Sequence, residues 1–95
     1  MIRETIHYAG QVQGVGFRYR TASIARLYPV AGTVRNLPDG RVKLVAEGDA
    51  DDVERFVDAV QDAMNANIHT VDSARSKGTG EFGPPGEPQN FRVVM

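Results

Sequence analysis

The amino-acid sequence predicts an α+β domain in which two helices cover one face of an antiparallel sheet. Three observations carry this prediction: segments whose apolar residues alternate, two segments whose apolar residues recur every three or four positions, and the order of these segments. We expect one domain over residues 1–95, because a chain of this length supports a single hydrophobic core.

The first predicted strand covers residues 3–9. Its side chains alternate, with Ile6 and Tyr8 on one face and Thr5 and His7 on the other. This period of two is typical of a strand with one buried face.

A helix and a hairpin are predicted next. The helix begins at Arg18, where apolar residues start to recur at helical spacing, and Pro29 ends it. Residues 30–36 and 41–47 are predicted to form two strands. Residues 37–40, which join them, contain a Pro-Asp-Gly sequence that suits a tight turn.

The second predicted helix has the clearest periodicity of the chain. Its apolar residues recur at i, i+3, i+4, i+7 and i+11: Val53, Phe56, Val57, Val60 and Met64. Asp49, Asp51 and Asp52 stand at its start, where capping and the helix dipole favour carboxylates. We interpret these carboxylates as helix-start residues rather than as a cation site.

Two strands, residues 68–76 and 91–95, complete the predicted sheet. The loop between them, residues 77–90, holds four glycines, three prolines and one large apolar residue, Phe82, so we expect a long surface loop without regular structure. Such a loop could cover a site, bind a partner or be a tolerated insertion. The order of elements matches the ferredoxin-like α/β sandwich (βαββαβ), an antiparallel sheet with two helices on one face.

Composition narrows the function classes. The formal net charge of -1 gives no field that would gather nucleic acid or an anionic membrane, and no segment is apolar enough to span a bilayer. The absence of cysteine excludes disulfides, thiolate metal sites and cysteine nucleophiles. His7 and His69 lack metal-ligand spacing. We therefore expect a soluble cytoplasmic monomer with a small-molecule substrate and neither nucleic-acid nor membrane partners.

A glycine-containing segment, residues 10–18, lies where the first strand leads into the first helix. Backbone N–H groups at such a position can converge on a small anion, and the helix start adds a favourable dipole. Gly14 and Gly16 leave the backbone unobstructed, and Arg18 offers a planar fork for two phosphate oxygens. The nucleotide P-loop and dinucleotide motifs are absent. On spacing alone, a structural turn is the commoner use of such a loop.

Beyond the glycine spacing, several sequence motifs occur in order along the first half of the chain. They are Gly10-Gln-Val-Gln-Gly-Val-Gly-Phe-Arg18, Thr21 and Ala25, Gly32-Thr-Val-Arg-Asn36, and Asp39-Gly40. Together they resemble the signature of the acylphosphatase family. The chain departs from the family at Thr33, commonly aromatic, at residues 64–67, which replace a Gly-Pro pair, and in the longer 77–90 loop.

The resemblance implies a site without metal or cofactor. It implies that backbone N–H groups of the loop bind phosphate, namely those of Gln13, Gly14, Val15, Gly16 and Phe17. Arg18 would bind the phosphate through its guanidinium, and Asn36 would position the attacking water. The leaving group is a carboxylate whose conjugate acid has a pKa of about 4, so no general acid is required.

Other functions for the same fold stay open. The same signature opens a much larger hydrogenase-maturation protein, whose remaining machinery does not fit into 95 residues. An RNA-recognition domain would carry an aromatic-rich string that residues 41–47 lack. A non-catalytic phosphate-binding or regulatory module is the alternative to the enzyme, but it gives no reason for pairing Arg18 with Asn36.

Overall fold

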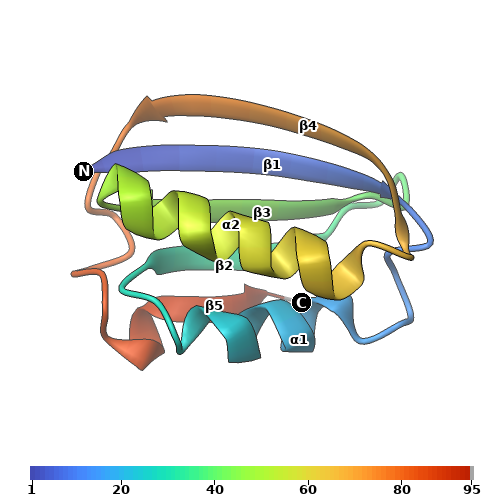
Figure 1. Cartoon of the computed structure of the whole chain (residues 1–95), viewed down its shortest axis with the longest axis horizontal. Helices are drawn as coiled ribbons and strands as arrows, with labels where there is room; N and C mark the ends of the chain where they lie inside the picture. The colour runs from blue at the N-terminus through green and yellow to red at the C-terminus, as the bar shows by residue number, and fades with distance from the viewer. Residues whose placement is uncertain (95) are drawn as a thin grey trace.

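The computed structural model describes residues 1–94 and shows two layers, with both helices on one face of a five-stranded sheet (Figure 1). In chain order the elements are β1 (Ile2–Gly10), α1 (Phe17–Ala25), β2 (Ala31–Asn36), β3 (Val42–Gly48), α2 (Ala50–Met64), β4 (Ile68–Lys77), the short 3-10 helix η1 (Pro88–Asn90) and β5 (Phe91–Val94). The predicted ferredoxin-like order is confirmed. Met95, the last residue of the final predicted strand, lies outside the described residues.

The sheet has the strand order β4-β1-β3-β2-β5. Three of its pairings are antiparallel, but β5 runs parallel to β2, so the prediction of a wholly antiparallel sheet was wrong. The reason lies in the connection from β4. It crosses from one edge of the sheet to the other without changing ends, so β5 runs opposite to β4 and alongside β2 (Figure 1).

The core lies between the sheet and the helices. Ile6 and Tyr8 of β1 are fully buried, as their alternation predicted. α2 buries the predicted stripe, with Val53, Phe56, Val60 and Met64 inside. Aromatic rings connect the two helices to the sheet: Tyr8 lies 5.2 Å from Phe17, and Phe56 lies 5.4 Å from Phe91, between ring centroids. These contacts fix the position of α1, and therefore of the loop that precedes it.

Two helix ends differ from the sequence prediction. α1 ends at Ala25, before Pro29, because Leu27 and Tyr28 donate to carbonyls three residues back and so form tight turns in place of a further α-helical turn. Asp49 is the N-cap residue of α2, but its side chain makes no capping hydrogen bond. Within residues 1–94, neither helix has the length and apolar character needed to cross a membrane.

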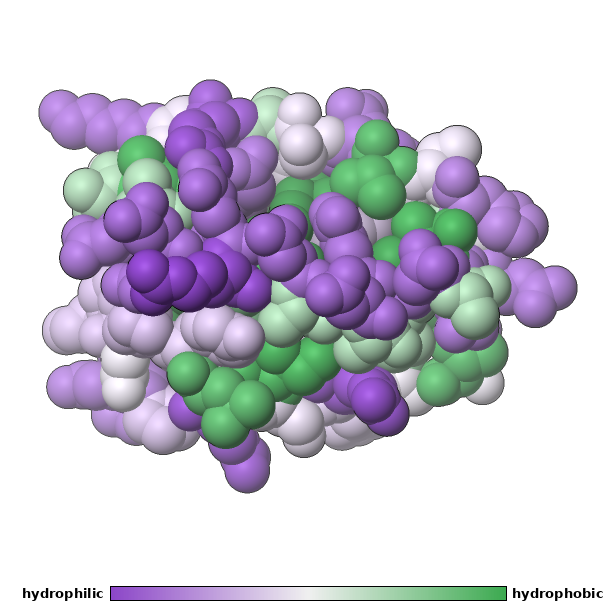
Figure 2. All heavy atoms as spheres, in the orientation of Figure 1, coloured by the Kyte–Doolittle hydropathy of each residue, from purple (hydrophilic) through white to green (hydrophobic). Residues whose placement is uncertain are grey.

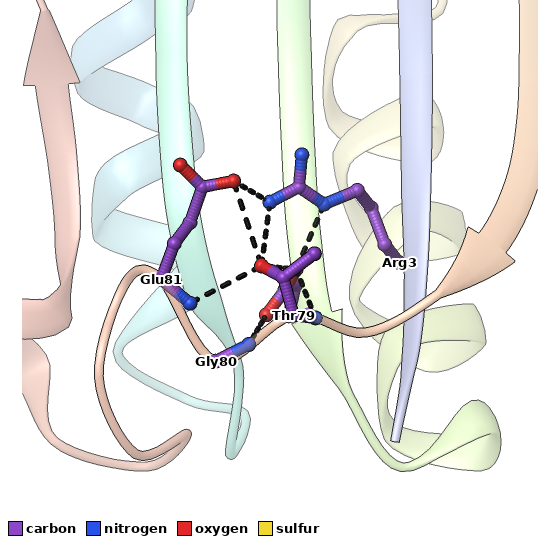
Figure 3. A network of polar contacts seen from close by, with 5 residues as sticks. Arg3, Thr79, Gly80 and Glu81 are labelled. Atoms are coloured by element: carbon purple, nitrogen blue, oxygen red, sulfur yellow. Dashed lines mark hydrogen bonds and ion pairs between the residues drawn. The ribbon is translucent and has the colours of Figure 1, made fainter.

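The 78–83 segment is anchored to the sheet by a buried carboxylate. Glu47 is 1% exposed, and its carboxylate accepts hydrogen bonds from the backbone N–H groups of Thr79 (3.0 Å) and Gly80 (2.9 Å). Arg3 donates to the same carboxylate at 2.7 Å and also contacts Thr79 and Glu81 (Figure 3). Polar bonds therefore order a segment that composition alone describes as irregular.

This anchoring also places the loop. Phe82, its single large apolar residue, lies under the Arg3 guanidinium, 5.1 Å from it. Arg3 and Gly78 mark the end of the sheet where β1 begins, whereas residues 11–16 follow the end of β1. The two loops lie at opposite ends of the molecule (Figure 1), so the 78–83 segment does not cover the glycine loop.

Candidate active site

Three strands end together where the glycine loop lies. β1 and β2 are each antiparallel to β3, and β5 is parallel to β2, so β1, β2 and β5 point the same way. Gly10, Asn36 and Val94 are their last residues. Segments far apart in the sequence thus meet at one end of the sheet, where these strands finish.

Buried side chains hold both ends of the glycine loop. Val12 and Phe17 are each 1% exposed, whereas the loop between them lies at the surface. Gly14 and Gly16 have φ angles of 75° and 78°, in the left-handed region that glycine adopts without strain. A side chain added at either position would meet no neighbouring atom within 4 Å. The left-handed backbone conformation, rather than a lack of room for a side chain, therefore favours glycine at these two positions.

The loop leads into the start of α1. The helical hydrogen bonds begin with the Arg20 N–H, which donates to the Gly16 carbonyl at 3.0 Å. The N–H groups of the three preceding residues, 17–19, therefore have no partner within the helix. Such groups, together with the positive end of the helix dipole, attract anions. A phosphate cradle at this helix start stays a prediction.

Arg18 is oriented by the last described residue of β5. Its guanidinium Nη1 donates to the Val94 carbonyl oxygen at 3.1 Å. The same guanidinium lies 5.9 Å from the centre of the Tyr19 ring. The side chain is half-buried, which strengthens its interaction with an anion relative to a fully exposed arginine.

Asn36 lines the same cavity as Arg18. The cavity has a volume of about 210 Å³, and its lining residues are Val12, Gly14, Gly16, Phe17, Arg18, Tyr19 and Asn36. The Asn36 amide oxygen is buried, and no group within residues 1–94 donates a hydrogen bond to it. A buried acceptor without a donor is uncommon and points to a water molecule or a ligand.

Gln13 connects the glycine loop to the β2–β3 turn. Its side-chain amide donates to the Leu37 carbonyl at 2.8 Å and to the Arg41 carbonyl at 2.9 Å. These carbonyls flank the turn that follows Asn36, and the Leu37 N–H bonds to the Arg41 carbonyl as well. One amide group therefore fixes the glycine loop relative to the strand end that carries Asn36.

The structure brings most of the predicted site residues together. Five of them line the cavity: Gly14, Gly16, Phe17, Arg18 and Asn36. Gln13 and Val15 do not line it, and the Val15 side chain is exposed. Sequence reasoning expected only a main-chain contribution from Gln13 and missed its bridging side chain. It also missed the Val94 carbonyl, because no residue type marks a backbone acceptor.

Among residues 1–94, no group of three or more His, Asp or Glu side chains is placed to hold a metal ion. His7 lies on β1 and His69 on β4, outside the lining of the cavity. The cavity lining contains no carboxylate. The residues with polar side chains in the lining are Arg18, Tyr19 and Asn36.

The fold and the arrangement at this end of the sheet define an α+β protein with a glycine loop at a helix start. Comparison with known proteins gives the family. The acylphosphatase family model matches residues 4–92. The acylphosphatase of Paenarthrobacter aurescens is 43% identical over 94 residues, covering 98% of this chain and 94% of the relative. The acylphosphatase of Archaeoglobus fulgidus is 48% identical over 61 residues, covering 64% of this chain and 68% of the relative.

Solved structures agree. The crystal structure of the Bacillus subtilis acylphosphatase matches with a TM-score of 0.82 and 31% identity over the whole of both chains. HypF from T. kodakarensis matches with a TM-score of 0.78 and 28% identity, but this chain covers only 12% of it. The chain belongs to the acylphosphatase family, whose members are hydrolases acting on acyl phosphates.

Proposed function

We propose that this acylphosphatase hydrolyses the carboxyl-phosphate bond of acyl phosphates with Arg18 and Asn36 as its catalytic residues and without a metal ion. The observation that supports these roles is that both side chains line one cavity beside the glycine loop and the start of α1. The loop and helix N–H groups bind the phosphoryl oxygens, and Arg18 binds two of them through its planar fork.

Hydrolysis of an acyl phosphate requires few catalytic groups. Phosphoryl transfer depends mainly on alignment and on stabilising charge at the phosphoryl oxygens. The departing carboxylate is stable as an anion, because the pKa of its conjugate acid is about 4, so it needs no protonation. A cavity that holds one guanidinium and no carboxylate suits such a leaving group.

Asn36 orients the attacking water. Its amide can accept a hydrogen bond and donate one, but it cannot take up a proton. The proton of the water therefore passes to an oxygen of the transferring phosphoryl group. The Gln13 bridge fixes Asn36 relative to the cradle, so the water and the phosphorus atom are held in line.

We further propose that the protein works as a cytoplasmic monomer. Every group assigned above comes from a single chain, so the site needs no partner subunit. A chain without cysteine gains nothing from an oxidising compartment.

Hydrolysis of benzoyl phosphate by the purified protein, with excess chelator, tests the proposal. We expect chelator-resistant turnover that Arg18→Ala and Asn36→Ala both lose. Phosphate binding by calorimetry separates their roles, because Asn36→Ala should keep it and Arg18→Ala should weaken it. Background rates from folded wild type would leave a phosphate-binding or regulatory module as the better assignment.

A further inference from the structure

A second concave surface lies along the outer side of α1. It has a volume of about 400 Å³ and is lined by Tyr19, Arg20, Ser23, Ile24 and Leu27. These residues recur at helical spacing on the side away from Phe17, Thr21 and Ala25, which α1 buries. We call this surface the α1 groove.

The α1 groove exposes large apolar side chains beside the charged Arg20. Tyr19 is 61% exposed and Leu27 is 77% exposed. These are two of the five large hydrophobic side chains that lie exposed within residues 1–94. Figure 2 shows hydrophobic side chains reaching the surface in the lower part of the view, over α1. Clustered exposed apolar residues beside a site mark a binding surface.

Tyr19 joins the groove to the phosphate cavity. This residue lines both concave surfaces, and its ring centre lies 5.9 Å from the Arg18 guanidinium. A ligand whose phosphate lies in the cradle therefore meets the Tyr19 ring first and the rest of the groove next. From Tyr19 to Ala25, the last residue of α1, the helix rises about 9 Å, and Leu27 lies in the turn beyond it. This length is enough for an aryl ring or a medium-length aliphatic chain.

We propose that the α1 groove binds the acyl part of the substrate and that the preferred substrates are acyl phosphates with a bulky apolar acyl group. This inference rests on the proposed hydrolysis at the adjoining cavity. The phosphate fixes one end of the substrate, so the groove adds binding energy only for acyl groups long enough to reach past Tyr19. Acetyl phosphate, whose acyl group ends at one methyl, gains nothing from Ser23 or Leu27.

Three substrates test the proposal: acetyl, benzoyl and octanoyl phosphate. For the wild type we expect kcat/KM to rise by about tenfold or more from acetyl to octanoyl phosphate, as apolar surface is removed from water. Leu27→Ser should lower kcat/KM for octanoyl phosphate by about fivefold and leave acetyl phosphate unchanged. Ser23→Gln, which places a polar side chain in the middle of the groove, should lower kcat/KM for both benzoyl and octanoyl phosphate.

Val71→Ser is the matched control. Val71 is also an exposed apolar residue, at 45%, but it lies on β4 at the far edge of the sheet. Its kcat/KM values should equal those of the wild type for all three substrates. Melting curves of all variants check that each remains folded.

The outcomes separate the two claims. If the wild type hydrolyses all three substrates but Leu27→Ser and Ser23→Gln keep the wild-type ratio of octanoyl to acetyl phosphate, the groove assignment is wrong and the hydrolysis stands. If the wild type hydrolyses none of them, the proposed function fails and the substrate preference fails with it.

Discussion

Two loops at opposite ends of the sheet use the same chemistry for opposite purposes. At one end, the N–H groups of Thr79 and Gly80 donate to the carboxylate of Glu47, and Arg3 completes the contact. At the other end, the N–H groups at the start of α1 lie beside Arg18 with no internal carboxylate in the cavity lining. Each loop combines backbone donors with one arginine.

The difference between the loops is the origin of the anion. The 78–83 segment binds the carboxylate of Glu47, which belongs to the protein itself. Its donors are therefore satisfied in the folded chain and contribute to stability. At the glycine loop, no carboxylate lines the cavity, so the N–H groups at the start of α1 could bind the anion of the proposed substrate. A donor set of this kind becomes structural or ligand-binding according to whether the protein supplies the acceptor.

The largest effect should come from exchanging the two arginines for lysine. Arg18→Lys should lower kcat/KM by about 100-fold or more, because an ammonium cannot replace the planar fork. Arg3→Lys should keep turnover and lower the free energy of unfolding instead. Steady-state kinetics and urea unfolding of both variants test this prediction. Near-normal turnover in Arg18→Lys would contradict the proposed role of the Arg18 guanidinium.

Removing the internal anion should affect stability and spare activity. Glu47→Gln should lower the free energy of unfolding by about 3 kcal/mol, because Arg3 and two backbone donors lose their charged acceptor. Glu81→Gln is the control, since this exposed partner of Arg3 should contribute under about 1 kcal/mol. Equal midpoints for the two variants in urea unfolding would contradict a structural anion at Glu47.

The Gln13 bridge should couple the two sides of the active site. Gln13→Ala should lower kcat by about tenfold through loss of alignment, with a smaller change in KM. It should also lower the free energy of unfolding by about 1 to 2 kcal/mol for two lost hydrogen bonds. Gln11→Ala, at an exposed position of the same loop, should change neither quantity. A change in KM alone would argue against a positioning role.

The smallest effect should appear as a pH dependence of stability. Burial opposes ionisation of Glu47, but the bonds from Thr79, Arg3 and Gly80 outweigh it and hold the pKa of this carboxyl below its ordinary value. The unfolded chain then takes up the proton first, at about pH 4.3, so stability present above that pH is lost as the pH falls through the folded pKa.

Urea midpoints measured from pH 7 to pH 3 check this sign. The midpoint of the wild type should fall more steeply at the acid end than that of Glu47→Gln, which has no carboxyl to titrate at this position. Parallel curves for the two proteins would show that Glu47 does not carry the acid dependence.

Much of the fold was accessible from sequence periodicity. The alternation around Ile6 and Tyr8 and the helical stripe from Val53 to Met64 report which side chains are buried, and burial is what the sheet and α2 require. The direction of β5 was not accessible, because it depends on the route of the 78–90 loop. The start of that loop is anchored by Glu47, a residue that local patterns present as an ordinary strand carboxylate.

In the candidate site, too, some residues could be predicted from the sequence and others could not. Gly14, Gly16, Arg18 and Asn36 were predicted because residue type and motif order carry their chemistry. Gln13 was assigned only its backbone, because the acceptors of its side chain are carbonyls 24 and 28 residues away, and a carbonyl has no sequence signature. Assignment of catalytic roles to Arg18 and Asn36 remains a prediction that the kinetic variants test.

The bond between Arg18 and Val94 also determines when the site can form during synthesis. It joins residues 76 positions apart, and β5 must pair with β2 before the carbonyl can reach the guanidinium. Chains leave the ribosome amino terminus first, so the residues of β1, α1 and the hairpin are exposed long before this contact is possible. A nascent chain would display the glycine loop early but acquire an aligned arginine only after residue 94 emerges, so activity would report that β5 has paired.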